Sequence, residues 1–166
     1  MKFNTKNMTI LAMLTALYVV LSAFLKFTLV GNIMVDLGYI VFAYALCLFG
    51  PCGTIVGVFG CALESILFSA YGFSISWAVA NLFIGLLCGN VFKLTENTWA
   101  RSLTTVIAVA IAMIAIKTII ECNLYGIPLA VKIPKNAVAF GADAVTMIIG
   151  LFFYKATEKK ISAIRA

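Results

Sequence analysis

Four charged residues interrupt otherwise apolar stretches of this sequence: Glu64, Lys117, Glu121 and Asp143. A charge removed from water is costly unless it is paired or bound to something. The chain contains no histidine, and so the commonest general acid–base residue is missing. These four residues therefore suit ion pairing or ligand binding better than catalysis, and we expect no catalytic residue.

The surrounding composition sets the environment of these charges. Of 166 residues, 64% are hydrophobic and only 11% are charged, with a mean hydropathy of +1.12. A soluble domain carries about 45–50% apolar and about 25% charged residues, and a disordered chain is more polar still. A soluble enzyme and a disordered chain are both excluded. A membrane-spanning helix needs about 20 residues, so six spans with short loops fill the chain.

Polar and turn-forming residues divide the sequence into expected helices. The segment Gly50-Pro51-Cys52-Gly53 predicts a turn, because proline lacks an amide donor and glycine frees the backbone. It makes the second helix short. We predict that residues 1–166 form one all-α transmembrane domain, a bundle of six helices. These cover residues 8–25, 37–49, 53–70, 76–92, 103–123 and 135–154, with loops at 26–36, 71–76, 93–101 and 124–134 and a basic tail at 155–166.

The net charge of +6 is explained better by membrane orientation than by nucleic-acid binding, because most basic residues flank apolar segments. Cytoplasmic loops of membrane proteins carry an excess of Lys and Arg. Eight basic residues fall at the termini and after the fourth expected helix, against three on the other side. The eight are Lys2, Lys6, Lys93, Arg101, Lys155, Lys159, Lys160 and Arg165, and the three are Lys26, Lys132 and Lys135. We therefore expect cytoplasmic termini and a multi-pass protein of the cell membrane.

The depth of the charges follows from the helix rise of about 1.5 Å per residue. Glu64 and Lys117 should lie about 9 Å, and Asp143 about 12 Å, below the outer ends of their helices. Glu121 is one turn from Lys117 and can pair with it at i, i+4. One interpretation is a buried ion cluster that locks the bundle. The other is the polar floor of an outward-open pocket, and both remain open.

Aromatic residues gather toward the same outer side: Phe27, Tyr39, Tyr71, Phe73, Trp77 and Tyr125. An interfacial belt of Trp and Tyr would give this pattern, and so would rings that stack on a ligand. Trp77 is the best candidate for stacking. No GxxxxGK[ST] phosphate loop, HExxH motif or Cys/His cluster occurs, so we expect no ATP hydrolysis, no metal site and no cofactor. The five cysteines suit apolar packing.

Small residues recur at a spacing of four, on one face of a helix. The pairs are Ala12/Ala16, Gly53/Gly57 and Gly85/Gly89. Small residues allow close approach of another membrane helix. For the two glycine pairs we favour packing within the bundle. For Ala12 and Ala16, packing within the bundle and contact with a partner helix both remain open on spacing alone.

Taken together, the chain resembles the substrate-binding S components of energy-coupling factor (ECF) transporters, which import vitamins and related micronutrients. The segment Ala12-Met13-Leu14-Thr15-Ala16 is similar to the family's Ala-x-x-x-Ala contact in the first helix. Val35-Asp36-Leu37-Gly38-Tyr39-Ile40, followed by Leu48-Phe49-Gly50-Pro51-Cys52-Gly53, is similar to its short second helix and Phe-Gly-Pro turn. The six-span layout agrees over the whole chain.

The resemblance implies a division of labour between subunits. This chain would capture substrate from outside, under a lid at residues 26–36, with no cofactor. A transmembrane coupling subunit, docked at Ala12 and Ala16, and two cytoplasmic ATPases would drive release inside. A riboflavin- or folate-like heterocycle is favoured, although pantothenate, which is not a heterocycle, and an unlisted heterocycle stay open. The candidate substrate-binding residues are Asp36, Tyr39, Glu64, Trp77, Lys117, Glu121, Lys132 and Asp143.

Two other functions stay open on the sequence. A stand-alone secondary transporter could use Glu64 and Asp143 as proton carriers, since buried carboxylates serve that role in membrane proteins. A non-transporting membrane adaptor could bind partners through its small-residue faces. Uptake by the single chain under a pH gradient would indicate the first, and a lack of any small-molecule binding would indicate the second.

The charge asymmetry predicts the topology directly. Single cysteines introduced on a cysteine-free background should react with an impermeant thiol reagent from outside at Ser74 but not at Thr95, because Thr95 belongs to the basic, cytoplasmic side. Labelling at Thr95 together with protection at Ser74 would indicate the opposite orientation in the membrane.

Overall fold

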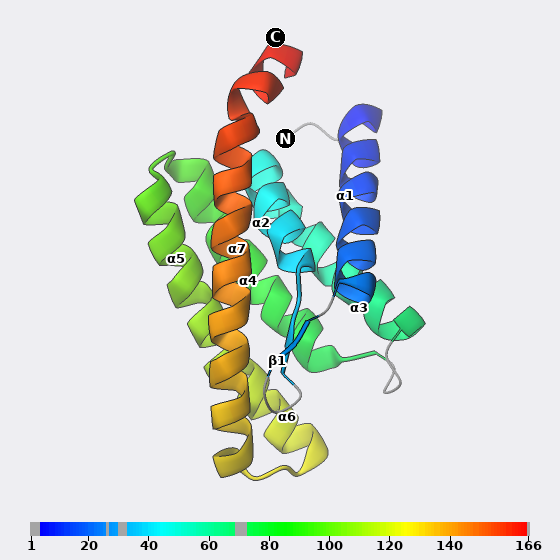
Figure 1. Cartoon of the computed structure of the whole chain (residues 1–166), viewed down its shortest axis with the longest axis vertical. Coiled ribbons are helices and arrows are strands. Elements are labelled where there is room, and N and C mark those ends of the chain that lie inside the picture. The colour runs from blue at the N-terminus through cyan, green and yellow to red at the C-terminus, as the bar shows by residue number, and fades with distance from the viewer. Residues whose placement is uncertain (1–3, 26, 30–32, 69–72, 166) are drawn as a thin grey trace.

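A computed structural model of the chain describes residues 4–25, 27–29, 33–68 and 73–165. The architecture is a helical bundle with one small hairpin at one end (Figure 1). The elements in chain order are α1 (Thr5–Phe24), β1 (Phe27–Leu29), β2 (Ile33–Val35), α2 (Gly38–Phe49), η1 (Gly50–Gly53), α3 (Thr54–Phe68), α4 (Ile75–Leu94), α5 (Thr98–Ala110), η2 (Ile111–Lys117), α6 (Thr118–Tyr125) and α7 (Leu129–Arg165).

The expected all-helical membrane architecture is confirmed. Within the described residues, five helical segments are long and apolar enough to cross a membrane. They are Thr5–Phe24, Gly38–Phe68, Ile75–Leu94, Thr98–Tyr125 and Leu129–Glu158. The second of these segments consists of α2, η1 and α3 together. Each of the two helices is too short to count as a span by itself, since α2 has 12 residues and α3 has 15. The short second helix was predicted from the Gly-Pro turn.

The two ends of the bundle are formed by different helices and loops. The start of α1, the turn between α4 and α5 and the end of α7 lie at the upper end in Figure 1. The β1–β2 hairpin, α6 and the start of α7 lie at the lower end. The two ends are called the terminal end and the hairpin end below.

Helix α2 forms the centre of the core. The side chains of Tyr39, Phe42 and Leu46 are fully buried, and α2 packs against α1, α3, α4 and α7. Glycines make this close packing possible. A Cβ added at Gly57 would stand 2.5 Å from the Phe42 ring, and one at Gly60 would stand 2.5 Å from the Tyr18 ring.

Both glycine pairs pack within the bundle, as predicted. Gly53 and Gly57 face α2, whereas Gly85 meets Thr54 of α3 and Gly89 meets Pro51 of η1. The predicted turn is also confirmed. Gly50 adopts a positive φ of 58°, which side chains other than glycine rarely tolerate.

Several predicted loops were too long. Helix α7 begins at Leu129, so the loop predicted at 124–134 is reduced to 126–128, and Pro134 lies inside the helix. Pro134 is only the sixth residue of α7, where proline removes a single backbone hydrogen bond. The amides of Val131 and Lys132 bond the Pro128 carbonyl at 3.0 and 3.3 Å and start the helix there. Contacts between α7 and α6 further stabilise this first turn.

Three other segments differ from the prediction. The predicted tail at 155–166 continues α7 to Arg165. Helix α5 begins at Thr98 because Asn97 caps it, its Oδ1 accepting a hydrogen bond from the Trp99 amide at 3.0 Å. The predicted loop at 26–36 contains an antiparallel strand pair, with Phe27 opposite Val35.

The packing of α3 on α2 gives a testable prediction. Gly57→Ala should destabilise the protein by about 1–3 kcal/mol, the usual cost of overpacking a tight core, because the new methyl would overlap the Phe42 ring. Gly141→Ala is the matched control, since a Cβ there meets nothing within 4 Å. Thermal unfolding in detergent should show a lower midpoint for Gly57→Ala only. If Gly57→Ala unfolded at the same temperature as Gly141→Ala and the unaltered chain, α2 and α3 would pack less closely at Gly57 than in this structure.

Candidate functional site

A buried cluster of charged and aromatic side chains lies at the hairpin end. Its centre is Lys117, the last residue of the π-helical segment η2. The Lys117 Nζ lies 3.3 Å from the centroid of the Trp77 ring on α4, a cation–π contact. Lys117 also lies 3.9 Å from Glu121 Oε1, which confirms the i, i+4 pairing predicted from the sequence.

Glu121 ties four elements of the bundle together. Its carboxylate accepts a 2.8 Å ion pair from Lys132 Nζ on α7 and a 3.3 Å hydrogen bond from the Ser76 hydroxyl on α4. The Lys117 ammonium lies on its other side. Because Glu121 is buried, these contacts compensate the loss of water around its charge.

Asp143 on α7 is the most deeply buried of the charged residues, at 1% exposure. Its Oδ2 atom accepts no hydrogen bond from the described residues. Its charge interacts electrostatically with Asp36 and Lys117. A buried carboxylate oxygen without a hydrogen-bond donor is unfavourable, and so this atom is left unsatisfied within the described residues.

Tyrosine and asparagine side chains link α1, α2, α3 and α4 next to Trp77. The Tyr39 hydroxyl donates to Asn81 Oδ1 at 2.7 Å, and Asn81 donates in turn to the Gly57 carbonyl at 3.2 Å. The Tyr39 ring lies 6.4 Å from Trp77 and 6.3 Å from Tyr18. This chain of contacts fixes the position of the Trp77 ring.

Asp36 connects the hairpin to the bundle. Its Oδ2 accepts a hydrogen bond from the Ser22 hydroxyl on α1 at 2.9 Å, and its Oδ1 accepts one from the Gly38 amide at 2.8 Å. The second contact is a local Asx-type turn that satisfies the first amide of α2. Strand β2 packs against α7. An apolar groove of about 560 Å³ separates Val35 and Leu37 from Val138, Ala142 and Val145 of α7.

The structure thus brings most of the candidate site residues together at one end. Trp77, Lys117, Glu121 and Lys132 are joined by direct contacts, and Asp143 interacts electrostatically with Asp36, Lys117 and Tyr39. Glu64 is buried on α3, where its charge acts on Tyr18 and Cys61. Ala12 and Ala16 lie exposed on α1, away from the buried face of that helix.

Sequence reasoning missed the uncharged polar members of the site. Ser22, Ser76, Asn81 and Asn136 are all buried, and Asn136 donates to Thr118 Oγ1 at 2.9 Å. A signal for them did exist. Each is a polar residue within or beside an apolar run, and buried polar groups need partners.

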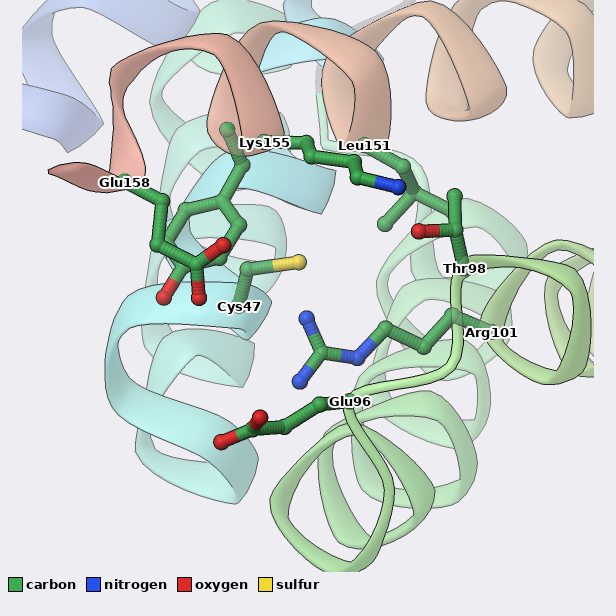
Figure 2. Close-up of a pocket in the computed structure, with 8 residues that line it drawn as sticks. Cys47, Glu96, Thr98, Arg101, Leu151, Lys155 and Glu158 are labelled. Atoms are coloured by element: carbon green, nitrogen blue, oxygen red, sulfur yellow. The ribbon is translucent and has the colours of Figure 1, made fainter.

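A second, smaller cavity of about 30 Å³ lies at the terminal end (Figure 2). Arg101 lines it and donates hydrogen bonds to the carbonyls of Thr95 at 2.7 Å and Phe92 at 2.9 Å, which caps the last turn of α4. Its guanidinium also lies 5.9 Å from the centroid of Tyr154 on α7. This cavity is water-sized, and its contacts hold α4, α5 and α7 together.

The pairing of charges at the hairpin end predicts a non-additive response to mutation. Lys117→Met should destabilise the protein by about 3–5 kcal/mol, the cost of leaving the other member of a buried pair uncompensated. Adding Asp143→Asn should restore part of that loss. Lys93→Met, at an exposed lysine of the opposite end, is the control. Thermal unfolding of the unaltered chain, the two single variants, the double variant and the control measures the coupling, and strictly additive losses would mean that Lys117 and Asp143 do not interact.

The fold is similar to that of two solved structures. The chain resembles the crystal structure of the S component for biotin from an ECF-type ABC transporter, with a TM-score of 0.70 and 21% identity over 96% of this chain and 95% of that one. It resembles the crystal structure of FolT bound with folic acid, with a TM-score of 0.72 and 22% identity over 89% and 94%. No curated protein sequence matches the chain significantly.

Residues 2–159 match the family described as "ECF-type riboflavin transporter, S component". The match covers nearly the whole chain. The chain belongs to the S-component family of ECF-type transporters and is a multi-pass membrane protein.

Proposed function

We propose that this chain captures a water-soluble vitamin at the hairpin end of the bundle and delivers it to the cytoplasm with the help of separate subunits. The observation that supports this most is the buried cluster of Trp77, Lys117, Glu121 and Asp143 beside the hairpin. Apolar residues at these positions would stabilise the bundle as well as the charged ones do, because buried ion pairs add little net stability. Stability alone therefore does not explain the charges. The family membership supports a role of the cluster in transport rather than in catalysis.

The proposed orientation has six spanning helices and cytoplasmic termini. In it α2 and α3 cross as two short helices on either side of η1. The basic residues near both termini favour this orientation. The start of α1 and the end of α7 lie at the same end of the bundle (Figure 1). The hairpin and the charged cluster then face the outside, where substrate arrives.

A flat heterocyclic vitamin fits the site best, and riboflavin is the first candidate because the family description names it. The partly buried Trp77 ring provides an aromatic surface, and the fully buried Tyr39 ring supports it with the two ring centroids 6.4 Å apart. Arg101, which could otherwise pair with an anionic substrate, lies at the terminal end in contact with Phe92 and Tyr154. The site therefore offers ring stacking and lysine contacts rather than an arginine.

Two measurements test the proposal. Mass spectrometry of the purified chain should identify a vitamin that co-purifies with it. Liposomes that contain the chain, a transmembrane coupling subunit and two ATPases should take up that vitamin only with ATP inside. Uptake by the chain alone, driven by a pH gradient, would instead indicate a proton-coupled transporter that uses the buried carboxylates Glu64 and Asp143.

The proposed contact with the coupling subunit is the face of α1 that carries Ala12 and Ala16. Both alanines are exposed, with Met13, Leu17 and Val20 also exposed on this helix. Small residues let a partner helix approach closely, and that approach drives association in lipid. Exposed alanines on α1 therefore suit a contact outside the bundle.

Ala12→Leu combined with Ala16→Leu should keep vitamin binding and thermal stability but abolish co-purification with the coupling subunit, because the larger side chains hold the partner helix away. Ala115→Leu, at an exposed alanine of η2, should change neither property. Vitamin affinity and recovery of the complex are measured on the same samples. A collapse of affinity together with stability would show that the alanines pack inside the bundle.

A further inference from the structure

Lys117 and Asp143 share an unusual property. Both are buried, at 4% and 1% exposure. Among the described residues, the Lys117 ammonium makes an ion pair and a cation–π contact but no hydrogen bond. Asp143 Oδ2 likewise has no hydrogen-bond partner there. A donor and an acceptor, close enough to interact electrostatically, are thus both left for a ligand.

The charge balance of this end argues for a neutral ligand group. Among the described residues, four carboxylates, those of Asp36, Glu64, Glu121 and Asp143, stand against three lysines, Lys117, Lys132 and the exposed Lys135. A ligand carboxylate would meet the Asp143 charge without an arginine to offset it. A ligand cation would meet the Lys117 ammonium, which already covers the Trp77 ring at 3.3 Å. Like charges brought together in a buried site are strongly unfavourable.

The Trp77 ring gives the ligand a plane. It is packed beside Tyr39, with ring centroids 6.4 Å apart, and Tyr39 is held by Asn81. Flat rings stack favourably on tryptophan. A ring that stacks on the face now covered by Lys117 must move the ammonium toward the edge of that ring. There the ammonium can donate to an oxygen of the ligand.

We propose that Lys117 and Asp143 determine specificity by reading the lactam edge of a flat heterocycle. By lactam edge we mean a ring C=O beside a ring N–H. The carbonyl oxygen accepts a hydrogen bond from Lys117, the N–H donates to Asp143 Oδ2, and the ring stacks on Trp77. This inference rests on the proposed function, since it assumes that the cluster is the vitamin site.

Several vitamins carry such an edge. Riboflavin has a ring N–H between two carbonyls, folic acid has a ring N–H beside one carbonyl, and biotin has a cyclic urea. Pyridoxine and pantothenate have no cyclic amide. The edge is therefore a chemical criterion that divides candidate substrates into two groups before any of them is tested.

Binding to the full chain in nanodiscs, followed by fluorescence or calorimetry, tests the inference with five probes: riboflavin, folic acid, biotin, pyridoxine and pantothenate. We expect one of the first three to bind. Its derivative methylated at the ring nitrogen should bind about 10- to 100-fold more weakly, the usual loss for a hydrogen bond to a charged group. This comparison uses the unaltered protein, and so no variant has to fold.

Variants then assign the contact to its residue. In Asp143→Ala the parent and methylated ligands should bind equally, because the acceptor is gone and space for the methyl group is created. Asp143→Asn, which keeps the shape and an acceptor oxygen, should retain part of the discrimination. Glu96→Gln, at an exposed carboxylate of the opposite end, should retain all of it.

The outcomes separate this inference from the proposed function. If pyridoxine or pantothenate binds and the three cyclic amides and urea do not, the chain is still a vitamin-capture subunit but the lactam edge is wrong. Equal binding of the parent and methylated ligands to the unaltered chain also overturns the inference. If no small molecule binds or co-purifies, the proposed function fails and the inference fails with it.

Discussion

The burial of Glu121 constrains how the helices α4, α6 and α7 and the segment η2 meet at the hairpin end. A carboxylate in an apolar bundle must be surrounded by donors, and it finds them on α4, η2 and α7 through Ser76, Lys117 and Lys132. These contacts fix the position of α7 at its start and the direction of the Lys117 side chain. Lys117 in turn covers Trp77, so one desolvated charge organises the aromatic and the charged halves of the site.

Helix α2 connects the charged cluster at the hairpin end with the terminal end of the bundle. It is only 12 residues long, yet it contacts structure near both ends. Tyr39 at its start bonds Asn81 beside the site. Tyr44 on its second half lies 3.1 Å from Thr157 and stacks edge-on against Tyr154 of α7 at 5.8 Å. The glycines of α3 and α7 that pack against α2 leave it little room to move.

The sequence predicts the charged part of the site better than the rest, for a physical reason. Charges such as Lys117 and Asp143 stand out in apolar helices because burying them is costly. Serine and asparagine at Ser76 and Asn81 cost less and give a weaker signal. The π-helical segment that ends at Lys117 has no sequence pattern comparable with a cap or a proline turn.

The errors in helix and loop boundaries have equally local causes. Pro134 was taken as the end of a loop, but a proline near the start of a helix removes only one hydrogen bond, and the contacts of α7 with α6 outweigh that loss. The hairpin was missed because its two strands have three residues each. The glycine pairs and the Gly50 turn were predicted correctly, since close approach and positive φ leave few other residue choices.

The length of α7 has a mechanical consequence. Asn136, which bonds Thr118, and Thr157, which lies against Tyr44, are separated by 21 residues of one helix, or about 32 Å at the usual rise per residue. This is close to the thickness of the hydrocarbon layer, about 30 Å. A helix is stiff along its axis, and so α7 holds these two contacts at a nearly constant separation. The contact of Asn136 at the hairpin end and that of Thr157 at the terminal end are therefore linked by one rigid element that is about as long as the hydrocarbon layer is thick.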